Sequence, residues 1–297
     1  MPTPILCIAG PTASGKSSRA VEEALARNGP NGAPFGGEII SVDSRQVYRG
    51  LDIGTEKITE EEMRGVPHHL IDIHDPKENY SASEFVADAS RLIEEIGARG
   101  KLPILVGGTH FYFDALLHGL PAHVDPNPVL REELEKLSSE VLFARVLARD
   151  PRRAAELDPK NRRRLIRALE IISTLGTVPH RPYHFRPIGQ KLYTVEWIVI
   201  NPTAKELRER IDARLKKALA RGLIEEVKRV QEDVGDARLN EFGLEYKIVG
   251  EYLRDERDKA SLLPTLSAKL WQLARRQKAW LRKLSLTMAT PSRPDKS

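Results

Sequence analysis

The sequence predicts an α/β fold, in which helices cover a parallel sheet and a helical insertion interrupts the core. Short apolar runs alternate with helix-like stretches over the first third of the chain, a pattern typical of a parallel sheet. A glycine-rich turn joins the first run to the first helix, and a basic helical stretch follows residue 120. With 297 residues, the chain is long enough for a core and a smaller second domain.

Apolar, β-rich runs provide the candidate strands of this sheet. The third run is weak, whereas the last is rich in β-branched residues and is expected to join the same sheet. The expected strands are 5–9, 38–42, 69–73, 103–106 and 193–201.

Helical periodicity predicts the remaining elements of the core. A helix follows the glycine-rich turn at 18–27, and another covers 81–98, with Ser81 or Ser83 as its N-cap and Gly100 as its end. Helices dominate after residue 201, at 205–221, 223–231, 245–254 and 265–283.

Two turn-rich segments, 120–128 and 177–187, flank the helical insertion. Inside it, helices are expected at 129–137, 142–149, 152–157 and 161–175. The expected organisation is a first part of the core at 1–120, the helical insertion at 121–191, a mainly helical second part of the core at 192–284, and a disordered tail at 285–297.

Positive charge is concentrated in two places, although the net charge is only +5. Residues 151–191 contain ten Lys or Arg against three Asp or Glu, and residues 275–283 contain five basic residues and no acidic one. Such clusters attract polyanions, of which nucleic acid is the commonest. A solvated helix face explains either cluster equally well when it is taken alone.

The sequence disfavours membrane, secreted and zinc proteins. No apolar run approaches the roughly 20 residues that span a bilayer, and the start of the chain lacks the charged region of a signal peptide. We therefore expect a cytoplasmic protein without a membrane partner. The single cysteine, Cys7, is interpreted as a buried apolar residue, and His68-His69 lacks a third metal ligand at a useful spacing.

The turn after the first strand fits the pattern of a phosphate-binding loop. Its glycines let backbone N–H groups converge on phosphate oxygens at a helix N-terminus. Lys16 adds a positive charge, and the Ser17 hydroxyl is placed to ligate Mg²⁺. The motif leaves open whether the phosphate belongs to a nucleotide. The loop consists of Gly10, Pro11, Thr12, Ala13, Ser14, Gly15, Lys16 and Ser17.

Two further strand ends carry polar residues where ligands bind in open α/β sheets. Asp43 follows the strand at 38–42 and is interpreted as a metal ligand, a general base or a structural cap. The strand at 103–106 leads into Gly107-Gly108-Thr109, where many P-loop ATPases have an acidic Mg²⁺ ligand. The lack of that acid counts against ATP hydrolysis.

Several motifs occur together in the order seen in bacterial tRNA dimethylallyltransferases, and the chain resembles that family over about residues 5–283. The resemblance implies a P-loop NTPase-like, nucleoside-kinase-like core and transfer of a dimethylallyl group to N6 of adenosine 37, beside the anticodon. The motifs are Gly10-Pro-Thr-Ala-Ser-Gly-Lys-Ser17, Ser41-Val-Asp-Ser44, Tyr48-Arg-Gly-Leu-Asp-Ile-Gly-Thr55, Pro67-His-His-Leu-Ile-Asp72, Tyr80-Ser-Ala82, Val106-Gly-Gly-Thr109, Arg163-Arg-Leu-Ile-Arg-Ala-Leu-Glu170, Arg210-Ile-Asp-Ala-Arg214 with Gly222-Leu223, and Ala274-Arg-Arg-Gln277 with Trp280.

The resemblance also implies roles for single residues. Dimethylallyl diphosphate would lie in the loop at 10–17, with Mg²⁺ held by Ser17, and Asp43 would take the proton of the adenine amine. The catalytic residues would be Asp43, Thr109, Lys16 and Arg214. The enzyme is expected to be a monomer that binds the anticodon stem-loop of tRNA. The tRNA contacts would be Asp43, Ser44, Arg45, Gln46, Arg163, Arg164, Leu165, Ile166 and Arg167.

The resemblance is incomplete near the C-terminus, where Gly243-Leu244-Glu245 and Leu270-Trp271 depart from the family pattern. The tRNA contacts of that region are therefore not carried over. Three other functions remain open: a small-molecule kinase on the same core, a prenyltransferase for free adenine nucleotides, and an RNA-binding module without activity. The basic insertion argues against the first two, and intact Lys16, Ser17 and Asp43 argue against the third.

Overall fold

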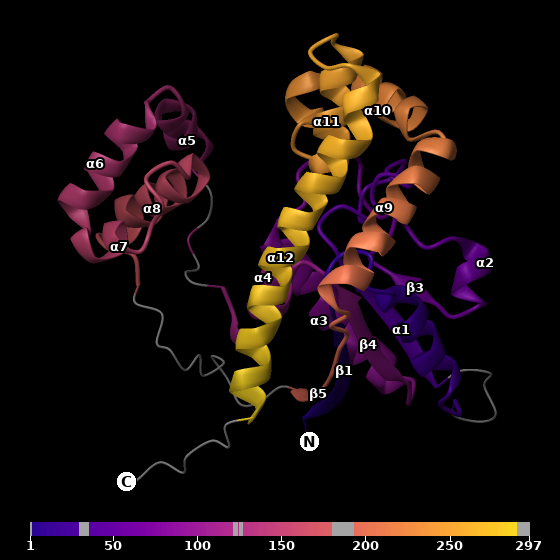
Figure 1. Cartoon of the computed structure of the whole chain (residues 1–297). Coiled ribbons are helices and arrows are strands. Elements are labelled where there is room, and N and C mark those ends of the chain that lie inside the picture. The colour runs from indigo at the N-terminus through magenta and orange to yellow at the C-terminus, as the bar shows by residue number, and fades with distance from the viewer. Residues whose placement is uncertain (1, 30–35, 121–123, 125–126, 180–192, 290–297) are drawn as a thin grey trace, which may run out of the picture. The chain divides into compact units, whose positions relative to one another are not determined.

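The computed structural model describes residues 2–29, 36–120, 124, 127–179 and 193–289 (Figure 1). The chain forms two compact units, one made of residues 1–117 and 189–297 and the other of residues 118–188. The first unit carries the sheet, and the second is helical. Most of the expected turn-rich segment at 177–187 and the end of the expected tail, 290–297, lie outside the described residues.

Within the described residues, the sheet has five parallel strands in the order β3-β2-β4-β1-β5. The predicted strands are present, and the last joins the same sheet as expected; the structure pairs it with β1. The third is shorter than predicted, because Leu70 and Asp72 adopt left-handed backbone, with φ of 60° and 55°, and end the extended segment. The strands are β1 (Thr3–Ala9), β2 (Gly37–Val42), β3 (His68–His69), β4 (Leu102–Gly107) and β5 (Tyr193–Val199).

The three central strands of the sheet, β2, β4 and β1, are buried on both faces, as is usual in parallel sheets. Along β1, Leu6 and Ile8 belong to the cluster that packs with α1 (Lys16–Leu25), whereas Cys7 belongs to the larger cluster that includes α3 (Ala82–Ala98). Successive side chains alternate between the faces of a strand, so one continuous apolar run supplies both layers. Cys7 is free and buried, as predicted, and burial raises its pKa above the ordinary range.

The helices of the C-terminal half pack into the larger cluster. Two of them pass their predicted ends: α10 continues beyond residue 231 through a kink at Gly235, whose φ is 75°, and α12 continues beyond residue 285, where the sequence predicts a tail. The short helices α2 (Glu60–Met63) and α4 (His110–His118) follow loop-like segments and are not predicted. The remaining helices are α9 (Ala204–Ala220), α10 (Leu223–Leu239), α11 (Leu244–Leu253) and α12 (Leu262–Ala289), with a 3-10 turn at Lys259–Ser261.

The unit at 118–188 has its own apolar core, which includes Leu142, Val146, Leu165 and Leu169. Its helices begin at polar N-caps whose side chains accept a hydrogen bond from the first turn. The predicted helices are present with slightly shifted ends. They are α5 (Pro128–Glu135), α6 (Ser139–Arg149), α7 (Pro151–Ala155) and α8 (Arg162–Leu175), capped by Asn127, Ser138, Asp150 and Asn161.

In the part of the chain that the structure describes, no helix combines the length and the apolar character that a bilayer crossing requires.

A buried carboxylate ties β2 to its neighbours in the sheet unit. Glu38 accepts hydrogen bonds from His69 Nε2 at 2.8 Å and Arg99 Nη2 at 2.8 Å, and its other oxygen lies 3.2 Å from Lys101 Nζ. Burial by itself raises the pKa of Glu38, but the hydrogen bonds from Arg99, His69 and Lys101 outweigh it and lower the pKa to about 2. The folded state therefore favours the ionised form.

We expect Glu38→Gln to destabilise the protein by about 1–3 kcal/mol at pH 7, the usual cost of losing hydrogen bonds to a charged group. Because the folded pKa of about 2 lies below the ordinary value of 4.5, the stabilisation is complete above pH 4.5 and is lost as the pH falls toward 2. Urea unfolding from pH 7 to pH 3 checks this, with the exposed Glu22→Gln as control. A difference that stays constant below pH 4.5 would contradict the assignment.

Candidate functional site

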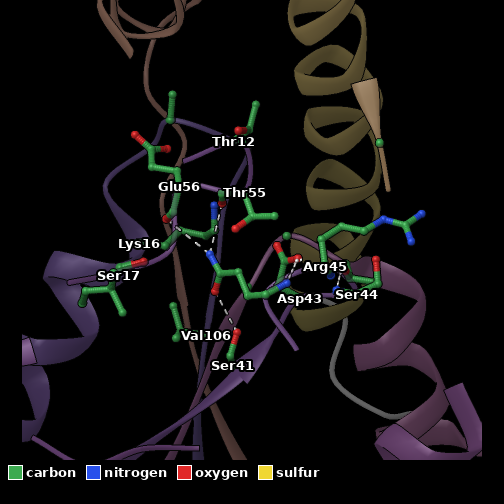
Figure 2. Close-up of a pocket in the computed structure, with 18 of the residues that line it drawn as sticks. Thr12, Lys16, Ser17, Ser41, Asp43, Ser44, Arg45, Thr55, Glu56 and Val106 are labelled. Atoms are coloured by element: carbon green, nitrogen blue, oxygen red, sulfur yellow. Dashed lines mark hydrogen bonds between the residues drawn. The ribbon is translucent and has the colours of Figure 1, made fainter. Parts of the chain in front are cut away.

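A cavity of about 420 Å³ opens at the carboxyl ends of β1, β2 and β4, the edge at which open α/β sheets bind ligands. Figure 2 shows Lys16 and Ser17 on one side of it and Asp43 across from them. All its walls belong to the sheet-bearing unit. They come from the loop after β1, β2 and the following turn, the loop at 54–58, the segment 68–71, the end of β4, α9, and the segments 242–245 and 270–277.

The loop after β1 turns the chain tightly into α1. Ala13 and Gly15 adopt left-handed backbone, with φ of 59° and 87°. Gly10 has no room for a side chain, because a Cβ there would lie 2.6 Å from Ser14 Oγ and 2.9 Å from the carbonyl oxygen of Ile200. No side chain of the described residues caps the first turn of α1, so its N–H groups can bind an anion at the helix N-terminus.

The Lys16 side chain extends back along this loop, where its Nζ donates a hydrogen bond to the carbonyl oxygen of Pro11 at 2.8 Å. Burial lowers the pKa of Lys16 to about 8; Asp43 opposes this shift, Arg214 reinforces it and Glu56 opposes it. An anion beside the ammonium group would favour the charged form. Lys16 is therefore placed to bind negative charge inside the cavity.

Arg214 extends from α9 and joins separate walls of the cavity. Its guanidinium donates to Thr12 Oγ1 in the loop after β1 and to the carbonyl oxygen of Gly54 at 3.3 Å. It also pairs with two carboxylates, Glu56 Oε2 at 3.1 Å and Glu245 Oε1 at 3.1 Å. Because the Arg214 side chain is only 11% exposed, these contacts define its position. The guanidinium thus lies against the same loop as Lys16.

Asp43 follows β2 directly and closes a turn with its own side chain. Its Oδ1 accepts hydrogen bonds from the backbone N–H groups of Arg45 at 2.8 Å and Gln46 at 3.3 Å, which holds the carboxylate at the cavity. Among the described residues, none donates a hydrogen bond to its second oxygen, Oδ2. A carboxylate held in this way can accept a proton from a ligand.

Thr109 stands just after β4, next to the Asp43 turn. Its Oγ1 accepts a hydrogen bond from the backbone N–H of Ser44 at 3.2 Å, and its own N–H donates to the carbonyl oxygen of Val42 at 3.3 Å. Gly107 permits this approach, since a Cβ there would lie only 2.0 Å from that carbonyl oxygen. Thr109 therefore lines the cavity and also orients the turn that carries Asp43.

Gln277 connects α12 to two of the strand ends. Its Oε1 accepts a hydrogen bond from the backbone N–H of Thr12 at 2.9 Å, and its Nε2 donates to the carbonyl oxygen of Gly108 at 3.1 Å. The sequence identifies Gln277 only as part of a family motif, because the contact with Thr12 joins residues 265 positions apart.

The cavity brings together most of the predicted site residues. The loop residues Gly10, Pro11, Ser14 and Gly15 belong to the turn without lining the cavity. The predicted residues that do line it are Thr12, Ala13, Lys16, Ser17, Asp43, Ser44, Arg45, Gln46, Thr109 and Arg214.

The other predicted residues lie on α8 in the unit at 118–188. Arg163 and Arg164 are exposed, whereas the side chains of Leu165 and Ile166 are buried in the core of that unit. Arg167 is half-buried and donates to the carbonyl oxygen of Val124 at 2.7 Å and to buried Glu170 at 3.4 Å. Among these five residues, Arg163 and Arg164 are the two that are classed as exposed.

Three charged residues of the cavity wall are not predicted: Glu56, Glu245 and Arg276. Glu245 belongs to the segment that departs from the family pattern. Burial raises the pKa of its carboxyl group, although Arg214 opposes this shift. For Glu56, the only signal in the sequence is the neighbouring motif that ends at Thr55. Nothing in the local sequence distinguishes Glu245 from an exposed helix residue.

The cavity suits a Mg²⁺ ion that arrives with a phosphate ligand. The Ser17 hydroxyl group, in the first turn of α1, lines the cavity together with the Asp43 carboxylate. No group of three or more His, Cys, Asp or Glu among the described residues could hold a metal ion. Mg²⁺ is commonly bound through one or two protein oxygens together with phosphate oxygens and water, so this donor set fits it.

Comparison with known proteins gives consistent matches. Residues 46–284 match the family described as IPP transferase. A tRNA dimethylallyltransferase of Thermomicrobium roseum is 41% identical over 288 residues, which cover 95% of this chain and 84% of that protein. One of Cupriavidus taiwanensis is 41% identical over 293 residues, which cover 94% and 88%.

Solved structures agree with these matches. The full-length tRNA isopentenylpyrophosphate transferase of Bacillus halodurans aligns with a TM-score of 0.68 and 37% identity, covering 94% of this chain and 87% of that one. A eukaryotic dimethylallyltransferase acting on tRNA aligns with a TM-score of 0.77 and 28% identity, covering 94% and 70%. Because the family match spans most of the chain, and the relatives are matched over most of their own length, this chain belongs to the IPP transferase family, that of the tRNA dimethylallyltransferases.

Proposed function

We propose that this chain transfers the dimethylallyl group of dimethylallyl diphosphate to N6 of adenosine 37 of a tRNA and releases pyrophosphate. The observation that carries the proposal is a single cavity lined by Lys16, Arg214 and Asp43, with two cations beside a tight loop and a carboxylate at the next strand end. Family membership favours prenyl transfer over the phosphoryl transfer of a kinase and over an RNA-binding module without activity.

The loop at 10–17 is proposed as a phosphate-binding loop of the P-loop NTPase type, on a nucleoside-kinase-like core, that holds the diphosphate. N–H groups at the start of α1 bind its oxygens, and Lys16 and Arg214 complement its charge. Donors that are already in place stabilise the negative charge that builds up on the leaving group. Ser17 would hold Mg²⁺, and the ion would supply positive charge that neutralises part of this negative charge.

The reaction forms one bond and breaks another. The adenine N6 attacks C1 of the dimethylallyl group, the C1–O bond breaks, and its electron pair leaves with pyrophosphate. Asp43 accepts the N6 proton through Oδ2, because its Oδ1 is engaged by the N–H groups of Arg45 and Gln46. Thr109 acts by orienting this turn through the N–H of Ser44.

The acceptor base must leave its stack to reach Asp43, because the amine is shielded in a stacked loop. Residues 43–46 would contact that base, and exposed basic residues of α8, in the unit at 118–188, would bind the phosphates of the anticodon stem-loop. Of the predicted contacts in that unit, we retain the side chains of Arg163 and Arg164. A monomeric enzyme acting in the cytoplasm, where tRNA is modified, belongs to the same proposal.

Arg163→Ala combined with Arg164→Ala is expected to weaken tRNA binding and to reduce the slope of log Kd against log salt concentration by about 1–2, because each phosphate contact contributes about 0.7–0.9. Filter binding at several salt concentrations measures the slope. Arg145→Ala combined with Arg149→Ala removes the same charge from exposed positions on α6 and serves as the matched control. Equal slopes for the wild type and the Arg163/Arg164 variant would count against the contact.

The direct test incubates the purified chain with unmodified tRNA, Mg²⁺ and dimethylallyl diphosphate, followed by digestion of the tRNA and nucleoside mass spectrometry. N6-dimethylallyladenosine at position 37 is the expected product. No product with tRNA, together with ATP consumption in the presence of a small-molecule acceptor, would favour the kinase alternative.

A further inference from the structure

A buried carboxylate that does not line the cavity holds one of the cavity's loops. Glu226, in α10, is 1% exposed. Its Oε2 accepts hydrogen bonds from the backbone N–H groups of Asp52 at 3.1 Å and Ile53 at 2.7 Å, and its Oε1 accepts one from Gly54 at 2.9 Å. Converging backbone amides of this kind bind anions, and here the anion is a side chain of the protein itself.

Tyr246, in α11, completes this arrangement. Its hydroxyl group donates to Glu226 Oε1 at 2.7 Å, and burial, reinforced by the neighbouring Glu226, raises the pKa of that hydroxyl so that it remains a donor. Its ring packs against Gly54, where a Cβ would lie 2.7 Å from the ring. The loop at 52–54 is thus held both by hydrogen bonds and by close packing.

The loop held by Glu226 carries partners of the cavity residues. Arg214 donates to the carbonyl oxygen of Gly54 at 3.3 Å and pairs with Glu56 Oε2 at 3.1 Å. Gln46 Nε2, from the Asp43 turn, donates to the carbonyl oxygens of Thr55 at 3.3 Å and Glu56 at 3.4 Å. A shift of this loop would therefore move the Arg214 guanidinium and loosen the support of the Asp43 turn.

We propose that Glu226 is a positioning residue for Arg214. By binding the amides of residues 52–54, it fixes the loop that directs the guanidinium toward the diphosphate, although Glu226 itself does not line the cavity. The identity of the diphosphate rests on the proposed function, whereas the contact between Glu226 and the loop does not. A purely structural role would predict lower stability without any coupling to Arg214.

Glu226→Gln tests this role. Glutamine keeps the length of the side chain, but its amide NH₂ group can only donate. Because the partners of Glu226 are N–H and O–H donors, hydrogen bonds to the loop or to Tyr246 are lost. We expect the KM for dimethylallyl diphosphate to rise about tenfold, the usual effect of losing one hydrogen bond to a charged group, with the tRNA Kd unchanged within about twofold. Glu225→Gln, at an exposed position of the same helix, is the matched control and should behave as the wild type.

Coupling to Arg214 separates positioning from folding. In an Arg214→Ala background, Glu226→Gln should add little to the KM for dimethylallyl diphosphate, because the group that it positions is gone. Full additivity of the two changes would overturn the proposal. If Glu226→Gln does not fold, Tyr246→Phe replaces it, because it removes one donor and keeps the carboxylate; it should raise KM in the same direction by a smaller factor.

Two further measurements distinguish a failure of this inference from a failure of the proposed function. Hydrogen–deuterium exchange of residues 51–57 should be faster in Glu226→Gln, and calorimetry should show weaker binding of inorganic pyrophosphate. If both hold while the wild type forms no prenylated adenosine, the role of Glu226 stands and the proposed reaction fails. Unchanged loop exchange together with unchanged pyrophosphate affinity would overturn the role of Glu226.

Discussion

Asp43→Asn is expected to lower kcat for dimethylallyl transfer by about 10²–10⁴, the usual contribution of a general base. Asparagine retains an oxygen that can accept the N–H groups of Arg45 and Gln46, so the turn is preserved, but its amide cannot take the N6 proton. The tRNA Kd should therefore remain within a few-fold of the wild-type value. Single-turnover rates at saturating tRNA and dimethylallyl diphosphate measure the chemical step directly.

The matched control for this prediction is Asp75→Asn. Asp75 is 44% exposed, is paired with Arg49 at 3.8 Å and does not line the cavity, so the same change of charge there should leave the rate unaffected. A near-normal single-turnover rate for Asp43→Asn would remove Asp43 from the mechanism. A rate lowered equally by both variants would point to a general charge effect.

The central strands of the core could be predicted because they are buried on both faces and therefore read as apolar runs, as residues 5–9 and 38–42 do. Strand ends are harder to predict, because they depend on backbone conformation. The segment at 69–73 is apolar enough for a strand, yet the left-handed backbone of Leu70 and Asp72 ends the strand at His69. Where the residue is neither Gly nor Asn, the sequence gives little signal for a left-handed backbone conformation.

The parts of the site that could be predicted lie next to strand ends. Lys16 is part of a recognisable motif. Asp43 and Thr109 come directly after strands whose carboxyl ends meet at one edge of the sheet. The supporting residues could not be predicted in this way. Glu226 contacts Gly54 across 172 positions, so only the packing of α10 against that loop reveals the pairing.

The five predicted tRNA contacts on α8 remain a prediction, but the structure shows that their side chains differ in exposure. A helix presents only part of its surface to any one partner. The apolar spacing of Leu165, Ile166 and Leu169 is typical of a core-facing stripe, and the structure buries all three side chains. Helical periodicity therefore separates the exposed Arg163 and Arg164 of this motif from its buried Leu165 and Ile166.

Lys16→Met is expected to lower kcat/KM for dimethylallyl diphosphate by about 10²–10³, the usual cost of removing one group that is aimed at developing negative charge. Methionine keeps much of the aliphatic length, but it loses the charge and the hydrogen bond to the carbonyl oxygen of Pro11. Lys77→Met serves as control, because Lys77 is 58% exposed and paired with Asp233 at the surface.

The separate values of kcat and KM decide how Lys16 acts. If Lys16 binds the diphosphate equally well before and during bond cleavage, Lys16→Met should raise KM and leave kcat unchanged. We expect kcat to fall as well, because charge accumulates on the pyrophosphate only as the C1–O bond breaks, and an ammonium group in a partly buried site interacts more strongly with that added charge. An unchanged kcat at saturating donor would assign Lys16 to substrate binding alone and leave Arg214 as the main protein cation that stabilises the leaving group.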